Sequence, residues 1–288
     1  MASMRDIQRR KVSIQSTEQI TKAMKLVATV KLQKARTRAE KAKPYFNNMY
    51  ETVQARLSRS GNIEHKYLKP GASDKKAVIV ITGNRGLAGG YNSNVTKMLT
   101  KNPEFSADKV VTYILGRKGK ENLSRYGYQV KEDYSEVMND PMYRDAMEIG
   151  AKVLKDFENG DFGELYIAYT VFKNTVSHIP TMLKVLPVSK NEETDNMSKS
   201  DKLTLMNFEP GEEEALDLII PKYVSSLIYG AIIEAVASEN GARMSAMDSA
   251  TSNADEMIAE LSLMYNRARQ SSITQELTEI IAGAEAIS

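Results

Sequence analysis

Glycines cluster in TGNRGLAGGYNSN, Thr82 to Asn94, directly after the apolar run AVIVI. A strand, a glycine-rich turn and the start of a helix are the parts of a phosphate-binding site. The four glycines are Gly83, Gly86, Gly89 and Gly90. Their spacing matches neither G-x-G-x-x-G nor G-x-x-x-x-G-K-[ST], since no lysine follows them before Lys97. Two interpretations stay open: an α/β protein that binds a nucleotide here, or a tight turn that lets a strand and a helix pack closely.

Other reactive side chains are scarce. The chain has no cysteine, which excludes disulfides, thiolate zinc sites and cysteine nucleophiles. Its two histidines, His65 and His178, are too few for a histidine-rich metal site, and we interpret His178 as a strand or loop residue. We therefore predict no metal site.

The bulk composition is that of an ordinary soluble protein, with 42% apolar and 26% charged residues among 288. The uninterrupted apolar runs are shorter than the roughly 18 residues that suggest a membrane span. The first twenty residues are basic but have no continuous apolar core, so we expect no secretory signal.

The small net charge of +2 hides an asymmetry between the chain ends. Residues 1–43 carry twelve basic and three acidic side chains, whereas residues 222–288 carry four basic and nine acidic ones. A basic helical segment at one end allows the alternative of a coiled-coil protein that binds nucleic acid. However, no aromatic residue that could stack on a base lies between Met1 and Pro44, and the acidic end favours pairing within the chain.

The sequence predicts a long helix at each end of the chain. No glycine precedes Gly61, and a helix over Met4–Lys43, about 60 Å long, can continue past Pro44 towards Leu57. No proline follows Pro221, so the C-terminal helix would approach about 100 Å. The N-terminal apolar stripe comprises Ile7, Ile14, Ile20, Met24, Val27, Ala28, Leu32 and Ala35. The C-terminal stripe comprises Tyr223, Leu227, Ala231, Ile232, Ala254, Met257, Leu261, Met264 and Ala268, and then Ile273, Leu277, Ile280, Ala284 and Ile287. Stripes of this spacing predict an antiparallel coiled coil.

The middle of the chain alternates between the two kinds of element. Strands are predicted at 77–82, 109–115, 164–172, within VSHIPTMLKVLPV and at 203–208, and helices at 92–100, 118–126 and 142–159. This order indicates a small Rossmann-like α/β domain with a mainly parallel sheet. The predicted fold class is thus α/β, with a long antiparallel two-helix coiled coil built from both termini. The predicted boundaries are 1–57 for the N-terminal helix, 75–209 for the globular domain and 211–287 for the C-terminal helix.

Two terminal stretches, QITKAMKLVATVKLQKA and YNRARQSSITQELTEIIAGAEAI, resemble the paired signatures of the gamma subunit of bacterial F-type ATP synthase. TGNRGLAGGYNSN and SENGARMSAMDSATSNADEMI resemble further motifs of that family. The resemblance is collinear from Met4 to Ile287 and is weakest between about Asp108 and Asp201.

The resemblance implies a rotor shaft that couples the ion-driven rotation of a ring of c subunits to conformational changes in catalytic beta subunits. It implies no catalytic residue and no cofactor in this chain. The implied partners are a hexamer of alpha and beta subunits, the epsilon subunit and the c ring, with one copy of the shaft per complex and no nucleic acid. The implied location is the cytoplasmic face of the bacterial cell membrane, peripheral to the bilayer.

The resemblance also assigns candidate contact residues. Arg269 and Gln270 correspond to the shaft's contact with a beta-subunit loop known as the catch, and the alternative is an ordinary solvated helix face. The remaining positions of this beta-subunit group are Met24, Arg243, Thr274 and Glu276. The positions expected on the side of the epsilon subunit and the c ring are Arg85, Phe208 and Glu209.

Overall fold

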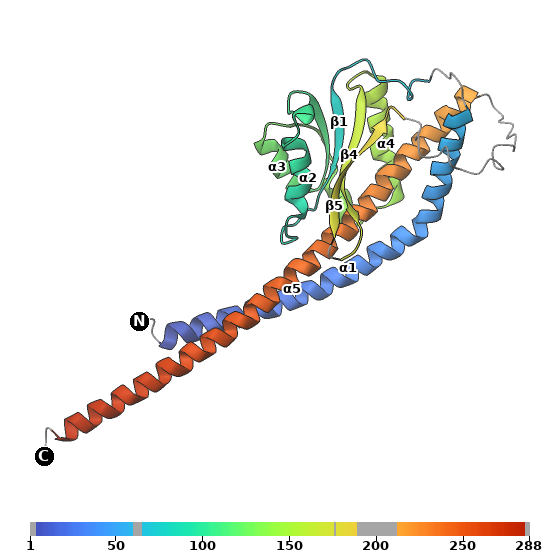
Figure 1. Ribbon diagram of the computed structural model, residues 1–288. Helices are drawn as coiled ribbons and strands as arrows, with labels where there is room; N and C mark the ends of the chain where they lie inside the picture. The colour runs from blue at the N-terminus through green and yellow to red at the C-terminus, as the bar shows by residue number, and fades with distance from the viewer. Residues whose placement is uncertain (1–3, 60–64, 176, 189–211, 286–288) are drawn as a thin grey trace. The chain divides into compact units, whose positions relative to one another are not determined.

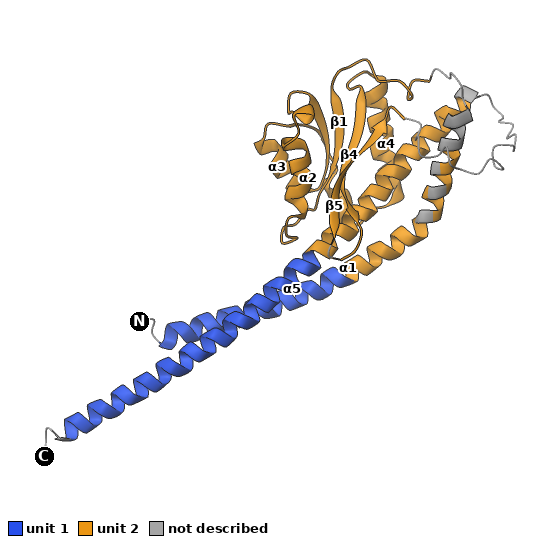
Figure 2. Cartoon of the chain, viewed as in Figure 1, with its two compact units in different colours: residues 1–29, 243–288 blue, residues 30–242 orange. Residues whose placement is uncertain are grey.

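The computed structural model describes residues 4–59, 65–175, 177–188 and 212–285 (Figure 1). The chain divides into two compact units (Figure 2). Unit 1 comprises Met1–Thr29 and Arg243–Ser288, and unit 2 comprises Val30–Ala242. Each unit is described by itself below.

Unit 2 contains a five-stranded sheet in the order β3-β2-β1-β4-β5. The strands are β1 (Lys76–Ile81), β2 (Val110–Leu115), β3 (Gln129–Asp133), β4 (Glu164–Phe172) and β5 (His178–Leu186). Strands β1 to β4 pair in parallel, and only β5 is antiparallel to its neighbour, which confirms the predicted mainly parallel sheet. Strand β3 goes unpredicted from the sequence, because QVKED is polar and forms a partly exposed edge. The strand predicted over 203–208 lies outside the described residues.

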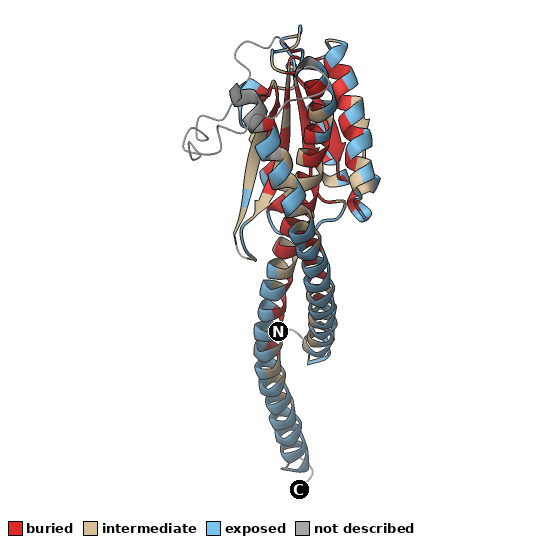
Figure 3. Cartoon of the chain, turned by 90° about the vertical axis from the view of Figure 1, so that its right-hand side faces the viewer, coloured by how far each residue is buried: buried red, intermediate tan, exposed pale blue. Residues whose placement is uncertain are grey.

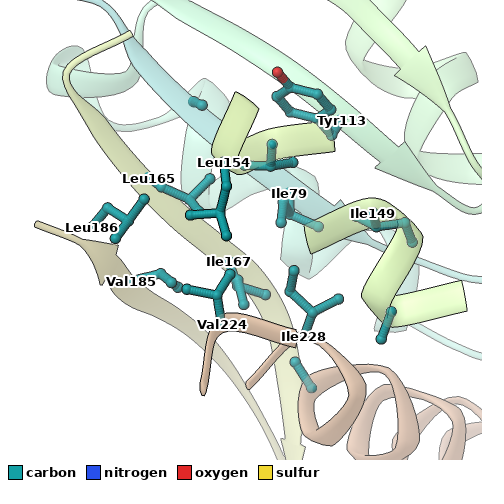
Figure 4. Packing of buried hydrophobic residues seen from close by; sticks show 14 of the residues in the cluster. Ile79, Tyr113, Ile149, Leu154, Leu165, Ile167, Val185, Leu186, Val224 and Ile228 are labelled. Carbon is teal, nitrogen blue, oxygen red and sulfur yellow. The ribbon is translucent and has the colours of Figure 1, made fainter. Parts of the chain in front are cut away.

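Helices cover both faces of this sheet. The three short α-helices are α2 (Tyr91–Thr100), α3 (Arg117–Arg125) and α4 (Tyr143–Glu158), each within about a residue of its predicted bounds. Single turns of 3-10 helix lie at Pro103–Phe105 and Ser135–Asn139. Along β1, Val78 and Val80 pack in the cluster with α2 and α3, whereas Ala77, Ile79 and Ile81 pack in the cluster with α4 and the C-terminal helix. Figure 4 shows Ile149 of α4 and Ile228 of the C-terminal helix beside Ile79 and Ile167 of the sheet. The alternation of side chains along a strand therefore supplies two separate cores.

The terminal helices are α1 (Met4–Arg59) and α5 (Glu212–Glu285), and α1 continues through Pro44 as predicted. Within unit 2 they pack together, for example through the rings of Phe46 and Tyr229, whose centroids are 6.1 Å apart. Helix α5 is long and apolar enough to cross a membrane, by length and composition only, but 56% of its most apolar stretch is buried in the molecule. A helix that covers a sheet is apolar for that reason, and Leu216, Ile220 and Val224 belong to the core.

Within unit 1, α1 and α5 also pair, and their least exposed residues follow alternating steps of three and four. On α1 these are Ile7, Lys11, Ile14, Glu18, Thr21, Lys25 and Ala28, with Met24 also half-buried beside them, and on α5 they are Met247, Thr251, Ala254, Ile258, Leu261, Tyr265, Ala268 and Ser272, with Arg243, Met244, Ala246, Ala250 and Ser262 also half-buried. This spacing is the heptad pattern of a coiled coil, and Figure 3 shows that the rest of both helices is largely exposed. We call these positions the seam. The predicted stripe is wrong at Ile20 and Val27, which are each 57% exposed, because the seam lies one residue further along at Thr21 and Ala28.

Candidate functional site

The glycine-rich turn connects β1 to α2, and its hydrogen bonds are made within the chain. The Gly83 amide donates to Oδ1 of Asn92 over 2.8 Å. The carboxylate of Glu239, on α5, lies against Gly83 so closely that a Cβ there would be 2.6 Å from Oε1. A carboxylate in this place opposes a phosphate, and a side chain at position 83 would require the Glu239 side chain to shift.

The start of α3 is also occupied by protein groups. The amides of Arg117, Lys118 and Gly119 donate to Oδ1 of Asn84, the carbonyl of Gly83 and Oγ1 of Thr82, over 3.0, 3.1 and 2.9 Å. Free amides at a helix N-terminus are what binds a phosphate, and here the turn itself satisfies them. The geometry therefore favours the packing interpretation of the glycines over the nucleotide-binding one.

The tip of this turn faces solvent. Arg85 is exposed, and its carbonyl accepts a hydrogen bond from Nδ2 of Asn92 over 3.3 Å. Leu87 is 65% exposed and has a φ of 60°, which non-glycine residues rarely adopt. The turn thus exposes one cationic and one large apolar side chain, and hydrogen bonds of Gly83 and Asn84 hold it to the rest of unit 2.

Four large apolar residues of α1 in unit 1 lie outside the seam and are exposed. Val12, Ile20, Leu26 and Val27 have exposed fractions between 53% and 68%. We call these four residues the outer apolar face. Apolar residues on both sides of one helix indicate two packing surfaces, and α5 covers only one of them.

Apart from Arg243, the predicted contact residues of α5 lie on its far part, towards its C-terminal end at Glu285. Arg269 and Gln270 are exposed, and within the described residues their side chains have no hydrogen-bond or ion-pair partner. The hydroxyl of Thr274 donates to the carbonyl of Gln270 over 2.9 Å, and Glu276 accepts a weak bond of 3.4 Å from Ser272. Arg269 and Gln270 are therefore the two members of this group with free polar ends.

Met24 and Arg243 are both half-buried in unit 1. Met24 adjoins Lys25, whose Nζ is 2.5 Å from Oδ1 of Asp248. The structure does not bring Met24 together with Arg269. Phe208 and Glu209 lie outside the described residues.

Two half-buried titratable residues lie where α5 meets the sheet in unit 2. Burial raises the pKa of Glu234 and lowers the pKa of His178, so both favour their neutral forms. Nε2 of His178 lies where a side chain at position 241 would be, which explains Gly241. In the ranges that the structure describes, no three His, Asp or Glu side chains are grouped to hold a metal ion.

Sequence reasoning missed the polar part of the seam, Glu18, Thr21 and Lys25, and the role of Glu239. A search of α1 for strict steps of three and four from Ile7 would have found the first group. No local signal could have found Glu239, because its partner Gly83 lies far away in the chain.

Comparisons with known proteins agree with this architecture. The family model described as ATP synthase matches residues 3–287. The chain is 65% identical over 291 residues to the ATP synthase gamma chain of Lachnoclostridium phytofermentans, covering 100% of both. It is 42% identical over 301 residues to the sodium ion specific ATP synthase gamma chain of Acetobacterium woodii, covering 99% of both. Its fold is similar to a chain of the Euglena gracilis mitochondrial ATP synthase, with a TM-score of 0.68, 20% identity and coverage of 99% of this chain and 94% of that one.

Proposed function

Because the chain belongs to the ATP synthase gamma chain family, we propose that its outer apolar face and the far part of α5 are the surfaces on which it turns against the alpha and beta subunits. The family supplies the central-stalk rotor of F-type ATP synthase, a non-catalytic subunit of a membrane-associated complex that includes F1 and the c ring. The question that remains is which side chains transmit the torque.

The outer apolar face is the observation that carries this proposal. Val12, Ile20, Leu26 and Val27 expose apolar side chains that a partner subunit would cover. Ile273, Leu277, Ile280 and Ile281 do the same near the end of α5, with exposed fractions of 48% to 68%. An apolar contact is non-directional and changes little with angle, so it suits a bearing in a sleeve made by the hexamer.

Polar contacts would supply the coupling that a smooth bearing lacks. Arg269 and Gln270 are free to bind a carboxylate or a carbonyl of a beta-subunit loop. Each such exposed contact contributes about 0–1 kcal/mol, which is weak enough to break in every cycle. Thr274 and Glu276 would support this contact from the next turns, and Met24 and Arg243 would form a second one.

The globular domain would be the foot of the rotor. Arg85, on the glycine turn, would meet acidic partner surface, and the epsilon subunit and c ring would bind this part of the molecule. Residues 1–57 and 211–287 would form the shaft and 75–209 the foot. One copy would serve each complex, at the cytoplasmic face of the cell membrane, where proton or sodium flow turns the ring.

The test is the double substitution Arg269→Ala, Gln270→Ala in the assembled enzyme. We expect ion-coupled ATP synthesis and the torque in single-molecule rotation to fall several-fold, because two contacts of about 1 kcal/mol each are lost. Gln275→Ala is the matched control, since Gln275 is exposed on the same helix but already donates to Glu279 over 2.9 Å. Unchanged synthesis and torque in the double variant would remove both residues from the coupling role.

A further inference from the structure

The contact between α5 and the sheet in unit 2 changes from apolar to polar along the helix. Large apolar side chains such as Ile220, Val224 and Ile232 belong to the core. From Glu234 to Ala242 the buried residues are instead small or polar, and they are Ala235, Ala237, Ser238, Glu239, Asn240 and Gly241. Small side chains bury little apolar surface, so the hydrophobic effect contributes less to this end of the contact.

One side of α5 meets the end of β4 and the start of β5 there. Glu234, Ser238 and Gly241 lie on this side, because steps of four and three residues return to the same side of a helix. The Ser238 hydroxyl donates to the carbonyl of Thr170 on β4 over 2.9 Å. A Cβ at Gly241 would be 2.7 Å from Nε2 of His178 on β5. We call these five residues the polar contact.

Glu234 has an enclosed carboxylate oxygen in the polar contact. Its Oε2 is buried and, within the described residues, has no hydrogen-bond partner. The group of β4 that senses its charge is Tyr169, whose pKa is raised to about 12 by burial and by Glu234. A neutral phenol does not compensate a negative charge. Burial raises the pKa of Glu234, and no charged neighbour in the described ranges contributes to that shift.

The other titratable groups of this region do not neutralise Glu234 either. His178 is kept neutral by burial, which lowers its pKa. Lys173 follows the end of β4, and Glu239 lies against Gly83 on the neighbouring strand's turn. None of the three forms an ion pair with Glu234 in the part of the chain that the structure describes. A charge on Glu234 would therefore be buried without compensation, which is unfavourable.

We propose that Glu234 makes the polar contact sensitive to pH, so that the contact is tight while Glu234 carries a proton and loosens when that proton is lost. An ionised carboxylate requires water at Oε2, and the closed contact excludes water from that atom. Since the folded state raises the pKa of Glu234, its contribution is fully present below the unfolded value of about 4.3 and is lost as the pH rises through the folded value.

The test uses one introduced thiol in the full-length chain, which has no cysteine of its own. Ser238→Cys places the thiol in the polar contact, at a position that is fully buried. The rate of thiol labelling is divided by the rate in the denatured chain at the same pH, which removes the titration of the thiol itself. From about pH 5 to about pH 8 we expect this relative rate to rise about threefold or more over that of Ser238→Cys, Glu234→Gln. His178 is present in both chains, so its own titration cancels.

Two controls separate this opening from other effects. Glu214→Gln removes an exposed carboxyl group from α5 and should leave the pH dependence of Ser238→Cys unchanged. Val80→Cys places a thiol in β1, where residue 80 is fully buried, and should be labelled far more slowly at every pH. Equal labelling of Ser238→Cys and Val80→Cys would mean that the whole unit unfolds, which overturns the proposal.

The same pH dependence with and without Glu234→Gln also overturns the proposal. If Ser238→Cys loses helix content, Ala237→Cys gives the same readout, because Ala237 is buried at the adjacent position of α5.

Discussion

At the scale of single residues, the glycines near the turn differ sharply in what they allow. A Cβ at Gly116 would be 2.1 Å from the carbonyl oxygen of Thr82, and its φ is 112°. A Cβ at Gly86 would have nothing within 4 Å. Gly116 is therefore required by a close approach of two backbone segments, whereas Gly86 is not required by packing.

Gly116→Ala should lower the free energy of unfolding by about 3 kcal/mol, because backbone strain and overpacking add at one position. Gly86→Ala is the matched control and should change it by less than about 0.5 kcal/mol. Denaturant unfolding of the full-length chain, followed by circular dichroism, measures both. Equal effects of the two substitutions would contradict the assigned role of Gly116.

At the scale of elements, Asp156 joins α4 to two strands. Its side chain is nearly buried, and Oδ2 accepts a hydrogen bond of 2.6 Å from Tyr113 of β2. Lys131 of β3 and Lys152 of α4 lie 3.1 and 3.2 Å from its carboxylate. Burial alone would raise the pKa of Asp156, but the hydrogen bonds from these three side chains lower it overall.

Asp156→Asn should lower the free energy of unfolding by about 2 kcal/mol, since it removes charge-assisted hydrogen bonds that attach α4 to the sheet. Asp161→Asn is the control, because Asp161 also pairs with Lys131 but its side chain is 44% exposed. We expect an effect below about 1 kcal/mol for the control. A ranking in the opposite order, measured by denaturant unfolding, would show that Asp156 does not hold α4 in place.

The same carboxylate predicts a pH dependence. Since the folded state lowers the pKa of Asp156, its contribution is fully present above the unfolded value of about 3.9 and is lost as the pH falls through the folded value. The difference in unfolding free energy between the original chain and Asp156→Asn should stay constant from about pH 7 to pH 5 and shrink below about pH 4. A difference that shrinks between pH 7 and pH 5 would assign the effect to another group.

At the scale of the whole molecule, the exposed apolar face of α1 is consistent with a chain that completes its packing only in an assembly. Leu26→Gln, Val27→Gln should leave the helix content unchanged, because glutamine is a good helix former. Assembly should weaken at least about tenfold, because each lost apolar side chain contributed about 1.5–3 kcal/mol when buried.

Copurification with the two larger subunits of the hexamer measures this effect. Thr29→Gln is the control, as Thr29 is exposed on α1 but does not belong to the outer apolar face. Full recovery of the complex with the double variant would mean that the outer apolar face is not a packing surface.

The sequence by itself determined the elements and the family. The long helices follow from runs without glycine or proline, and the sheet follows from apolar segments that alternate with helical ones. These are local patterns, because the spacing of side chains on a helix or strand repeats within a few residues. The polar edge strand β3 could not be predicted from a local pattern, because its pairing with β2, and not its composition, makes it a strand.

Only the tertiary structure decided which face of α1 meets α5 and what the glycine turn is for. Ile20 and Thr21 are neighbours in sequence, and the apolar pattern favoured Ile20 for the seam. Thr21 instead faces Thr251, which is 230 residues away in the chain. Gly83 likewise lies against Glu239 of α5, which is far away in the chain. The local sequence pattern predicts which faces of a helix can pack. Which partner lies against each face is decided by the tertiary structure.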